Sequence, residues 1–216
     1  MVRAVIFDMD GVIVDSEPLA DVQNTIFLKK LGHEIDRSFL HATYGLTARK
    51  FWEIVKKRLE LPQDIEELVR VHREFTLSYW SSVEKLKPIA GIPELIERLK
   101  DEKIRLALAS SANSKRIPIF LEKLGMRGVF DVVISGDDIT HSKPDPEIYL
   151  KAAKKLDVSP RDCLAIEDAT SGVASAGAAG MKVIAYRAPN SRQDLSAADL
   201  VIEDFAELDG EMLKAL

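Results

Sequence analysis

The sequence has a single cysteine, Cys163, among its 216 residues, so an internal disulfide is excluded. No histidine lies near that cysteine in sequence, which favours a buried thiol in a core strand over a catalytic nucleophile. Blocks of basic residues are also missing, and the 30 Lys and Arg residues are outnumbered by 35 Asp and Glu, for a net charge of −5. With this charge pattern we expect no nucleic-acid partner.

Long hydrophobic runs are absent as well. The first apolar run ends after a few residues at Asp8 and Asp10, so it has neither the length nor the composition of a secretory signal or a transmembrane span. We therefore expect a cytoplasmic protein with no membrane partner, and we expect it to be a monomer. At 46% hydrophobic residues, the chain can bury a full core of its own.

The pattern around which the chain is organised is MVRAVIFDMDGVIVDSE, residues 1–17. Residues 4–7 are apolar and partly β-branched, which predicts a strand buried on both faces of a parallel sheet. Asp8 follows at the carboxyl end of this strand, where open α/β sheets bind their ligands, and Asp10 points the same way on an extended backbone. One carboxylate can then act as nucleophile or metal ligand while the other moves protons. An isolated D-x-D is nevertheless more typical of a turn that ends a strand.

Between this strand and the next strand signal, the sequence shows helical periodicity. The predicted helices cover residues 19–31, 38–41, 48–59 and 63–80. A block of helices between two strands indicates a small helical domain inserted after the first strand. We therefore predict a helical domain over residues 15–87 and a second domain formed by residues 1–14 and 88–216.

From residue 88 onward, helices and strands alternate. The predicted order is helix 92–100, strand 104–109, helix 115–124, strand 132–134, helix 145–156, strand 163–166, helix 171–179, strands 182–185 and 200–202, and a last helix from residue 205. Asp145 and Pro146 are expected to begin their helix as N-cap and first helical residue. The alternation predicts an α/β fold with a doubly wound, Rossmann-like parallel sheet core and an inserted α-helical cap domain.

Polar residues follow four successive predicted strands. They are Asp8 and Asp10, then Ser110 and Ser111, then Lys143 in the loop after 132–134, and finally Glu167 and Asp168. Serine hydroxyls and free amides at a helix start can hold phosphate oxygens, a lysine supplies a point charge, and clustered carboxylates bind Mg²⁺. Taken alone, Ser110 would be an ordinary helix N-cap and Lys143 a solvated loop lysine.

Four segments, FDMDGVIVDSE, LALASSANS, SKPDPEIY and IEDATSG, resemble in order and spacing the four motifs of the haloacid dehalogenase superfamily. Within it, the chain is similar to the β-phosphoglucomutase-like phosphatase branch, over nearly its whole length and including the helical insertion. The resemblance implies a phosphatase that hydrolyses small phosphorylated carbohydrates through an aspartyl-phosphate intermediate. Mg²⁺ is the implied cofactor, and oxygen ligands would let Mn²⁺ or another divalent cation substitute.

The resemblance also assigns roles to single residues. It makes Asp8 the nucleophile, Asp10 the acid/base that protonates the leaving oxygen and then activates water, and Lys143 the group that neutralises charge on the nucleophile and phosphoryl group. Phosphate contacts fall to Ser110 and the amide of Ser111. The metal ligands would be Asp8, the backbone carbonyl of Asp10, Glu167 and Asp168, with Glu167 either on the metal or on one of its waters.

Two residues of the helical insertion are further candidates. Residues 45–49 resemble the loop that faces the substrate in this branch, which makes Thr47 and Arg49 possible substrate contacts. An ordinary place on a helix surface is the alternative for Arg49.

Two other functions stay open. One is a β-phosphoglucomutase, which would have to grip a second phosphate and keep water from the aspartyl phosphate. Mutases of this kind have a histidine where Ala20 stands and a basic residue where residues 112–114 read Ala-Asn-Ser, so the sequence favours hydrolysis. The other is a non-catalytic binding module on the same fold. It is disfavoured because such a protein should have lost at least one of the motif residues, and Asp8, Asp10, Lys143 and Asp168 are all present.

Overall fold

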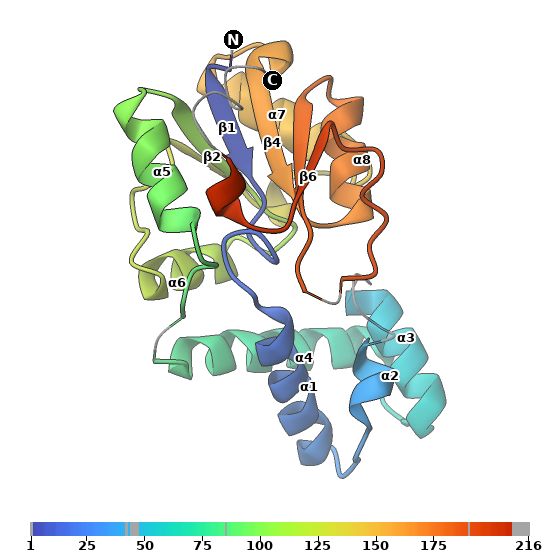
Figure 1. The fold of residues 1–216 in the computed structure, drawn as a ribbon. Coiled ribbons are helices and arrows are strands. Elements are labelled where there is room, and N and C mark those ends of the chain that lie inside the picture. The colour runs from blue at the N-terminus through green and yellow to red at the C-terminus, as the bar shows by residue number, and fades with distance from the viewer. Residues whose placement is uncertain (1, 42, 44–47, 85, 190, 209–216) are drawn as a thin grey trace. The chain divides into compact units, whose positions relative to one another are not determined.

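The computed structural model describes residues 2–41, 43, 48–84, 86–189 and 191–208. The chain divides into two compact units, one made of residues 1–15 and 85–216 and the other of residues 16–84. We call them the sheet unit and the helical unit. Figure 1 shows the strands gathered in the sheet unit and the helices α1 to α4 in the helical unit.

The sheet unit is built on six parallel strands in the order β3-β2-β1-β4-β5-β6. Their bounds are β1 Ala4–Phe7, β2 Arg105–Ala109, β3 Val132–Ile134, β4 Cys163–Glu167, β5 Lys182–Tyr186 and β6 Leu200–Ile202. This strand order confirms the predicted doubly wound α/β fold, in which the chain builds outward from β1 on one side and then restarts beside it with β4.

Helices cover both faces of this sheet, which explains why the central strands are apolar throughout. The helices are α5 Ile92–Asp101, α6 Arg116–Lys123, α7 Glu147–Leu156 and α8 Thr170–Ala178. Ala4 and Ile6 of β1 share one buried cluster with Ile148 of α7 and Val173 of α8. Because strand residues alternate, Phe7 belongs to the opposite face, where its ring lies 6.0 Å from that of Phe130. Figure 1 shows α5 and α6 on the side of the sheet away from α7.

The helical unit contains α1 Glu17–Lys30, α2 Arg37–His41, α3 Ala48–Leu59 and α4 Ile65–Ser82. Its core is aromatic, and the rings of Phe27 and Trp52 pack around the imidazole of His72. Burial lowers the pKa of His72 from 6.5 to about 4, so this imidazole is neutral at neutral pH. Its Nε2 is 2.9 Å from Nε2 of Gln23, a buried polar side chain of α1.

A few predicted boundaries differ from the structure. Helix α7 begins at Glu147, so Pro146 is its N-cap and not, as predicted, its first helical residue with Asp145 as the cap; Asp145 Oδ1 accepts the Glu147 amide at 2.9 Å. At the predicted last helix the structure has a short 3-10 turn, Phe205–Glu207, and the remainder from residue 209 lies outside the described residues. Over the described part of the chain, none of the helices has the length and apolar character needed to cross a membrane.

Candidate active site

The carboxyl ends of β1 and β4 lie side by side, at the point where the strand order changes direction. Phe7 is in register with Ile166, and the amide of Asp8 donates to the Ile166 carbonyl at 3.0 Å. Asp8 is therefore level with Glu167, the last residue of β4, and Asp168 follows it. Parallel α/β sheets bind ligands at such a switch point, which makes this edge the place to look for chemistry.

Lys143 ties the two strand ends together. Its Nζ lies 2.6 Å from Oδ1 of Asp8 and 2.6 Å from Oε1 of Glu167, and it also donates to the Ala109 carbonyl at the end of β2 at 3.3 Å. The three charged side chains are buried, with exposed fractions of 8% for Lys143, 10% for Asp8 and 1% for Glu167. Burying charges is costly, and buried charged groups of this kind cluster at functional sites. The arrangement therefore marks this edge of the sheet as a candidate site.

Burial and charge act in opposite directions on these groups. Burial raises the pKa of Asp8 from 3.8 to about 7, although the Lys143 ammonium lowers it in part. For Lys143, burial lowers the pKa, but the carboxylates of Asp8 and Glu167 more than compensate, so the pKa rises above its ordinary value. Lys143 therefore stays positively charged at neutral pH. The pKa of Asp8 stays raised despite Lys143, so the lysine alone does not balance the cost of burying the Asp8 charge.

Glu167 is held by two residues to which the sequence pattern assigned no role. The Tyr149 hydroxyl donates to Glu167 Oε1 at 2.6 Å, and the Tyr149 ring lies 5.2 Å from the Lys143 ammonium. On the other side, a Cβ at Gly172 would lie 2.0 Å from the Glu167 carboxyl carbon, so only glycine lets α8 pack against this carboxylate. The segment SKPDPEIY ends at Tyr149, but the sequence does not indicate the partner of its hydroxyl, because that partner lies on another element.

The carboxylates of Asp8, Glu167 and Asp168 form a set that suits a divalent cation. Each offers one oxygen, and these atoms lie within 4.8 Å of one another. Gly11, at φ +81°, leaves the space that Asp168 fills, since a Cβ there would lie 1.9 Å from Asp168 Oδ2. A donor set made only of carboxylate oxygens is that of Mg²⁺, Mn²⁺ or Ca²⁺, and the under-compensated charge of Asp8 calls for a further cation. The residues present therefore fit the predicted metal.

Asp10 has a cation of its own, Arg116, at the first residue of α6. Arg116 Nη2 lies 2.5 Å from Asp10 Oδ1, and the two side chains are 19% and 33% exposed. The sequence favours hydrolysis over a mutase because residues 112–114 contain no basic residue for a second phosphate, but Arg116, two residues further on, is basic and pairs with Asp10. The sequence pattern assigned no role to Arg116, and the one signal that could have indicated it is its position just after the loop of Ser110.

The loop that follows β2 carries the predicted phosphate contacts. Ser110 is 1% exposed, and its Oγ accepts the Ala112 amide at 3.1 Å, while Ser111 is exposed. Gly136, after β3, donates to the Ala112 carbonyl at 2.8 Å and has no room for a Cβ, which would lie 2.4 Å from the Ser111 carbonyl oxygen. The loop is thus braced at the edge of the sheet that also carries Asp8.

The remaining two candidates, Arg49 and Thr47, come from the helical insertion. Arg49, at the start of α3, is 57% exposed and forms an ion pair with Glu66 of α4, within the helical unit. Thr47 lies outside the described residues.

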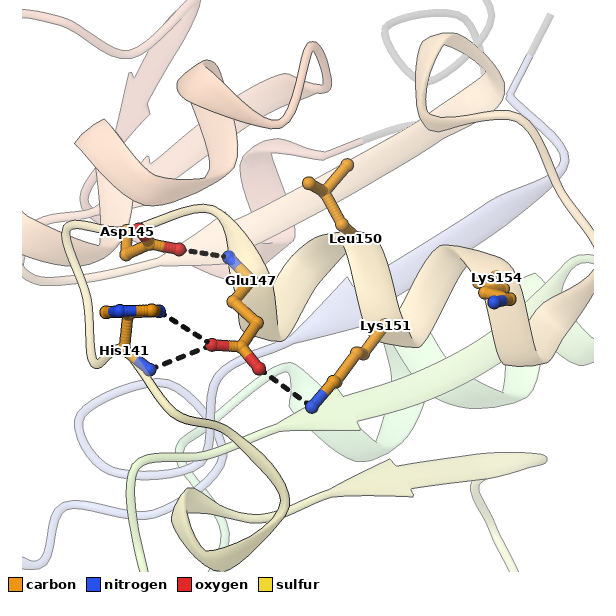
Figure 2. Close-up of a pocket in the computed structure, with 6 residues that line it drawn as sticks. All are labelled: His141, Asp145, Glu147, Leu150, Lys151 and Lys154. Carbon is orange, nitrogen blue, oxygen red and sulfur yellow. Dashed lines mark hydrogen bonds and ion pairs between the residues drawn. The ribbon is translucent and has the colours of Figure 1, made fainter.

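A second group of possible ligands, His141, Asp145 and Glu147, lines a shallow surface pocket (Figure 2). Figure 2 shows that Glu147 is already engaged, since it accepts the His141 amide at 2.8 Å and pairs with Lys151 at 2.7 Å. These contacts lower the pKa of Glu147 to about 2, with the Lys151 hydrogen bond as the largest cause. The Asp145 and Glu147 side chains connect the loop that carries Lys143 to the first turn of α7. Their carboxylate oxygens already take part in these contacts.

Comparison with known proteins gives a consistent set of relatives. The model of the haloacid dehalogenase-like hydrolase family matches residues 5–186. A phosphorylated carbohydrates phosphatase of Thermotoga maritima is 35% identical over 183 residues, which cover 84% of this chain and 83% of that protein. A beta-phosphoglucomutase of Bacillus subtilis is 32% identical over 216 residues, which cover 98% and 93%. Among solved structures, CbbY from Rhodobacter sphaeroides in complex with xylulose-(1,5)bisphosphate is 27% identical, with a TM-score of 0.81 and 96% of each chain covered.

Proposed function

The chain belongs to the haloacid dehalogenase-like hydrolase family, and on this premise we propose that it is a phosphatase that hydrolyses small phosphorylated carbohydrates, with Asp8 carrying the phosphoryl group in transit. One observation carries the proposal: Lys143 holds Asp8 and Glu167 together, at 2.6 Å from each, beside Asp168 at the carboxyl edge of the sheet. The phosphatase from Thermotoga maritima supports the substrate class.

In the first step, an oxygen of Asp8 attacks the phosphorus of the substrate, and the bond from phosphorus to the sugar oxygen breaks. Asp10 donates a proton to the departing oxygen, so that the sugar leaves as an alcohol. Lys143 offsets the negative charge on Asp8 and on the phosphoryl oxygens. Ser110 and the amide of Ser111 hold those oxygens in line for the attack.

In the second step, Asp10, now a carboxylate, removes a proton from a water molecule. The resulting hydroxide attacks the phosphorus, the bond to Asp8 breaks, and inorganic phosphate is released. Asp10 has regained its proton and Asp8 its charge, so the cycle closes without an external oxidant or reductant.

Asp8, Glu167, Asp168 and the backbone carbonyl of Asp10 would hold Mg²⁺, with Glu167 contacting the ion directly or through water. When bound, the ion supplies positive charge that draws the phosphate to Asp8 and fixes the line of approach. The chain's own contribution is to keep the oxygen ligands apart at the correct spacing, through Lys143 on one side and the close approach of Gly11 on the other.

Removal of divalent cations is expected to abolish phosphate release, and Mg²⁺ should restore it, with Mn²⁺ as a substitute. The four carboxylates, Asp8, Asp10, Glu167 and Asp168, carry −4 when ionised, and Lys143 with Arg116 returns +2, leaving −2 to face a phosphate dianion. At about 4 Å and an effective dielectric of about 20, each pair of like charges costs about 4 kcal/mol. The measurement is phosphate release before and after exhaustive chelation. Full activity after chelation, or unchanged Mg²⁺ affinity of Asp168→Ala by calorimetry, would contradict this charge argument.

A β-phosphoglucomutase is the second candidate. It is favoured by the relative from Bacillus subtilis, which matches 98% of this chain. Against it stand Ala20, in the place of a histidine, and the Ala-Asn-Ser sequence at 112–114, although Arg116 brings positive charge near that loop.

A substrate panel separates the two candidates. Purified protein with Mg²⁺ is incubated with hexose 6-phosphates, other sugar phosphates and β-glucose 1-phosphate, and free phosphate and isomerised sugar phosphate are both measured. We expect phosphate release from several sugars. Conversion of β-glucose 1-phosphate to the 6-phosphate faster than phosphate appears would favour the mutase, and no turnover of any substrate would favour a binding module.

The proposal extends to the organisation of the chain. Residues 15–87 would form a cap that shields the phosphorylated Asp8 from solvent and opens to release product, with Thr47 and Arg49 as contacts to the sugar. The cytoplasmic location and the monomeric state stay predictions from the sequence.

A further inference from the structure

Each of the two aspartates that follow β1 has its own cation in the sheet unit. Lys143 contacts Asp8, and Arg116 contacts Asp10 with Nη2 at 2.5 Å from Oδ1. The surroundings of the pairs differ, because the Asp8 side chain is 10% exposed whereas that of Asp10 is 33% exposed. A half-buried carboxylate on a loop depends more on such a contact for its orientation than a carboxylate enclosed by the fold does.

Arg116 is held both at its guanidinium and at its backbone. Its Cζ lies 4.4 Å above the ring centroid of Phe120, a fully buried residue one turn further along α6. Its backbone amide donates to Asn113 Oδ1 at 2.9 Å, which joins the start of α6 to the loop of Ser110. The ring of Phe120 limits where the guanidinium can lie, and the backbone hydrogen bond fixes the point on α6 from which the side chain extends, so Arg116 can hold its partner in one orientation.

The contact is chemically compatible with both states that Asp10 must adopt. A carboxylate accepts hydrogen bonds on either oxygen, and a carboxyl group protonated on Oδ2 still offers Oδ1 as an acceptor. An N–H donor on Oδ1 therefore keeps the group oriented while the other oxygen gives up a proton and later takes one. The position of Arg116 on one oxygen, at 2.5 Å, meets this requirement.

We propose that Arg116 is a positioning residue that orients Asp10 for proton transfer in both halves of the reaction. The inference rests on the proposed function, because it needs Asp10 to be the acid/base. Arg116 acts through Asp10, so its loss should lower kcat/KM, which does not report the second half of the reaction, only for substrates whose leaving oxygen needs a proton.

The test uses Arg116→Met, which keeps an unbranched apolar stem and removes the guanidinium, and Lys115→Met as a control that removes an exposed neighbouring cation. Because kcat/KM reports only the steps up to departure of the leaving group, it is measured on a sugar phosphate and on nitrophenyl phosphate, whose leaving group needs no proton. We expect Arg116→Met to lower kcat/KM on the sugar phosphate about 10- to 100-fold. The loss should lie in kcat, with KM within about twofold of the wild type. On nitrophenyl phosphate, kcat/KM should stay within about twofold of the wild type. Lys115→Met should match the wild type on both.

A double-mutant cycle with Asp10→Asn completes the experiment. If Arg116 acts through Asp10, adding Arg116→Met to Asp10→Asn lowers kcat/KM on the sugar phosphate by less than about twofold. Arg116→Lys, which keeps the charge, should recover part of the loss and serves as the second variant if Arg116→Met folds poorly. Equal losses on both substrates, or losses that multiply in the double variant, would overturn the inference. A wild-type protein that releases no phosphate would instead overturn the proposed function.

Discussion

Asp8→Asn is expected to reduce phosphate release to less than about one part in 10⁴ while the protein stays folded, because the amide has nearly the size of the carboxylate but is a poor nucleophile. The structure adds a reason for the intact fold. Burial raises the pKa of Asp8 to about 7, so a neutral group in this place is well tolerated, and the amide oxygen can still accept from Lys143. The melting temperature should stay within about 4 °C, or about 1 kcal/mol for a chain of this size.

The measurements for Asp8→Asn are phosphate release, thermal unfolding and mass spectrometry of acid-quenched protein. In the wild type with substrate, we expect a phosphoryl group on the peptide that contains Asp8, and we expect none in the variant. The matched control is Asp157→Asn, the same chemical change at an exposed C-cap with φ 55°, a conformation that asparagine adopts readily. Retention of a few per cent of activity in Asp8→Asn would refute the covalent mechanism.

Lys143→Met is expected to remove both stability and activity. It leaves the buried carboxylates of Asp8 and Glu167 facing each other without their cation, and breaking a buried pair in this way costs about 3–5 kcal/mol. Loss of the charge that offsets the phosphoryl oxygens should lower kcat by about 10²- to 10³-fold, the scale seen when one electrostatic donor is removed.

The destabilisation by Lys143→Met should grow with pH. The pKa of folded Asp8 already lies above its unfolded value of 3.8, at about 7, and removal of the lysine raises it further. Folded Asp8 then binds more protons than unfolded Asp8, so its contribution to stability is fully present below about pH 4 and is lost as pH rises through the folded pKa. Urea unfolding at pH 5 and at pH 8 tests this. Lys154→Met, on an exposed part of α7, should stay within about 0.5 kcal/mol at both pH values. A loss of equal size at pH 5 and pH 8 would show that the lysine does not compensate Asp8.

The parts of the site that the sequence predicts are those that lie at strand ends. Asp8 and Glu167 were placed together correctly because parallel strands in register bring their carboxyl ends to one edge. The parts it does not predict depend on side chains that reach between elements. Arg116 meets Asp10 across 106 positions of sequence, and Tyr149 meets Glu167 although its own helix marks it only as a core residue. Periodicity reports which face of an element is buried, and it carries no information on where a terminal hydroxyl or guanidinium ends up.

The boundaries of helices and strands likewise include some that the sequence predicts and some that depend on hydrogen bonds it does not reveal. The observed limits of α3 and β3 agree with those predicted from the apolar pattern. The start of α7 was placed one residue early, since an aspartate followed by a proline permits more than one way of starting a helix and the hydrogen bonds of Glu147 select among them.

The pairing of β1 also has a consequence for the order in which the protein assembles. Ala4 pairs with Arg105 on one side and with Cys163 on the other, so both neighbours of β1 are made about a hundred residues or more after it. The helical unit, residues 16–84, is contiguous and is complete in the chain before β2 exists. Local contacts form faster than distant ones, and domains fold as units during synthesis. The segment that carries Asp8, the proposed nucleophile, is therefore among the last to be enclosed, and Asp8 gains Glu167 as its neighbour only when β4 has been made.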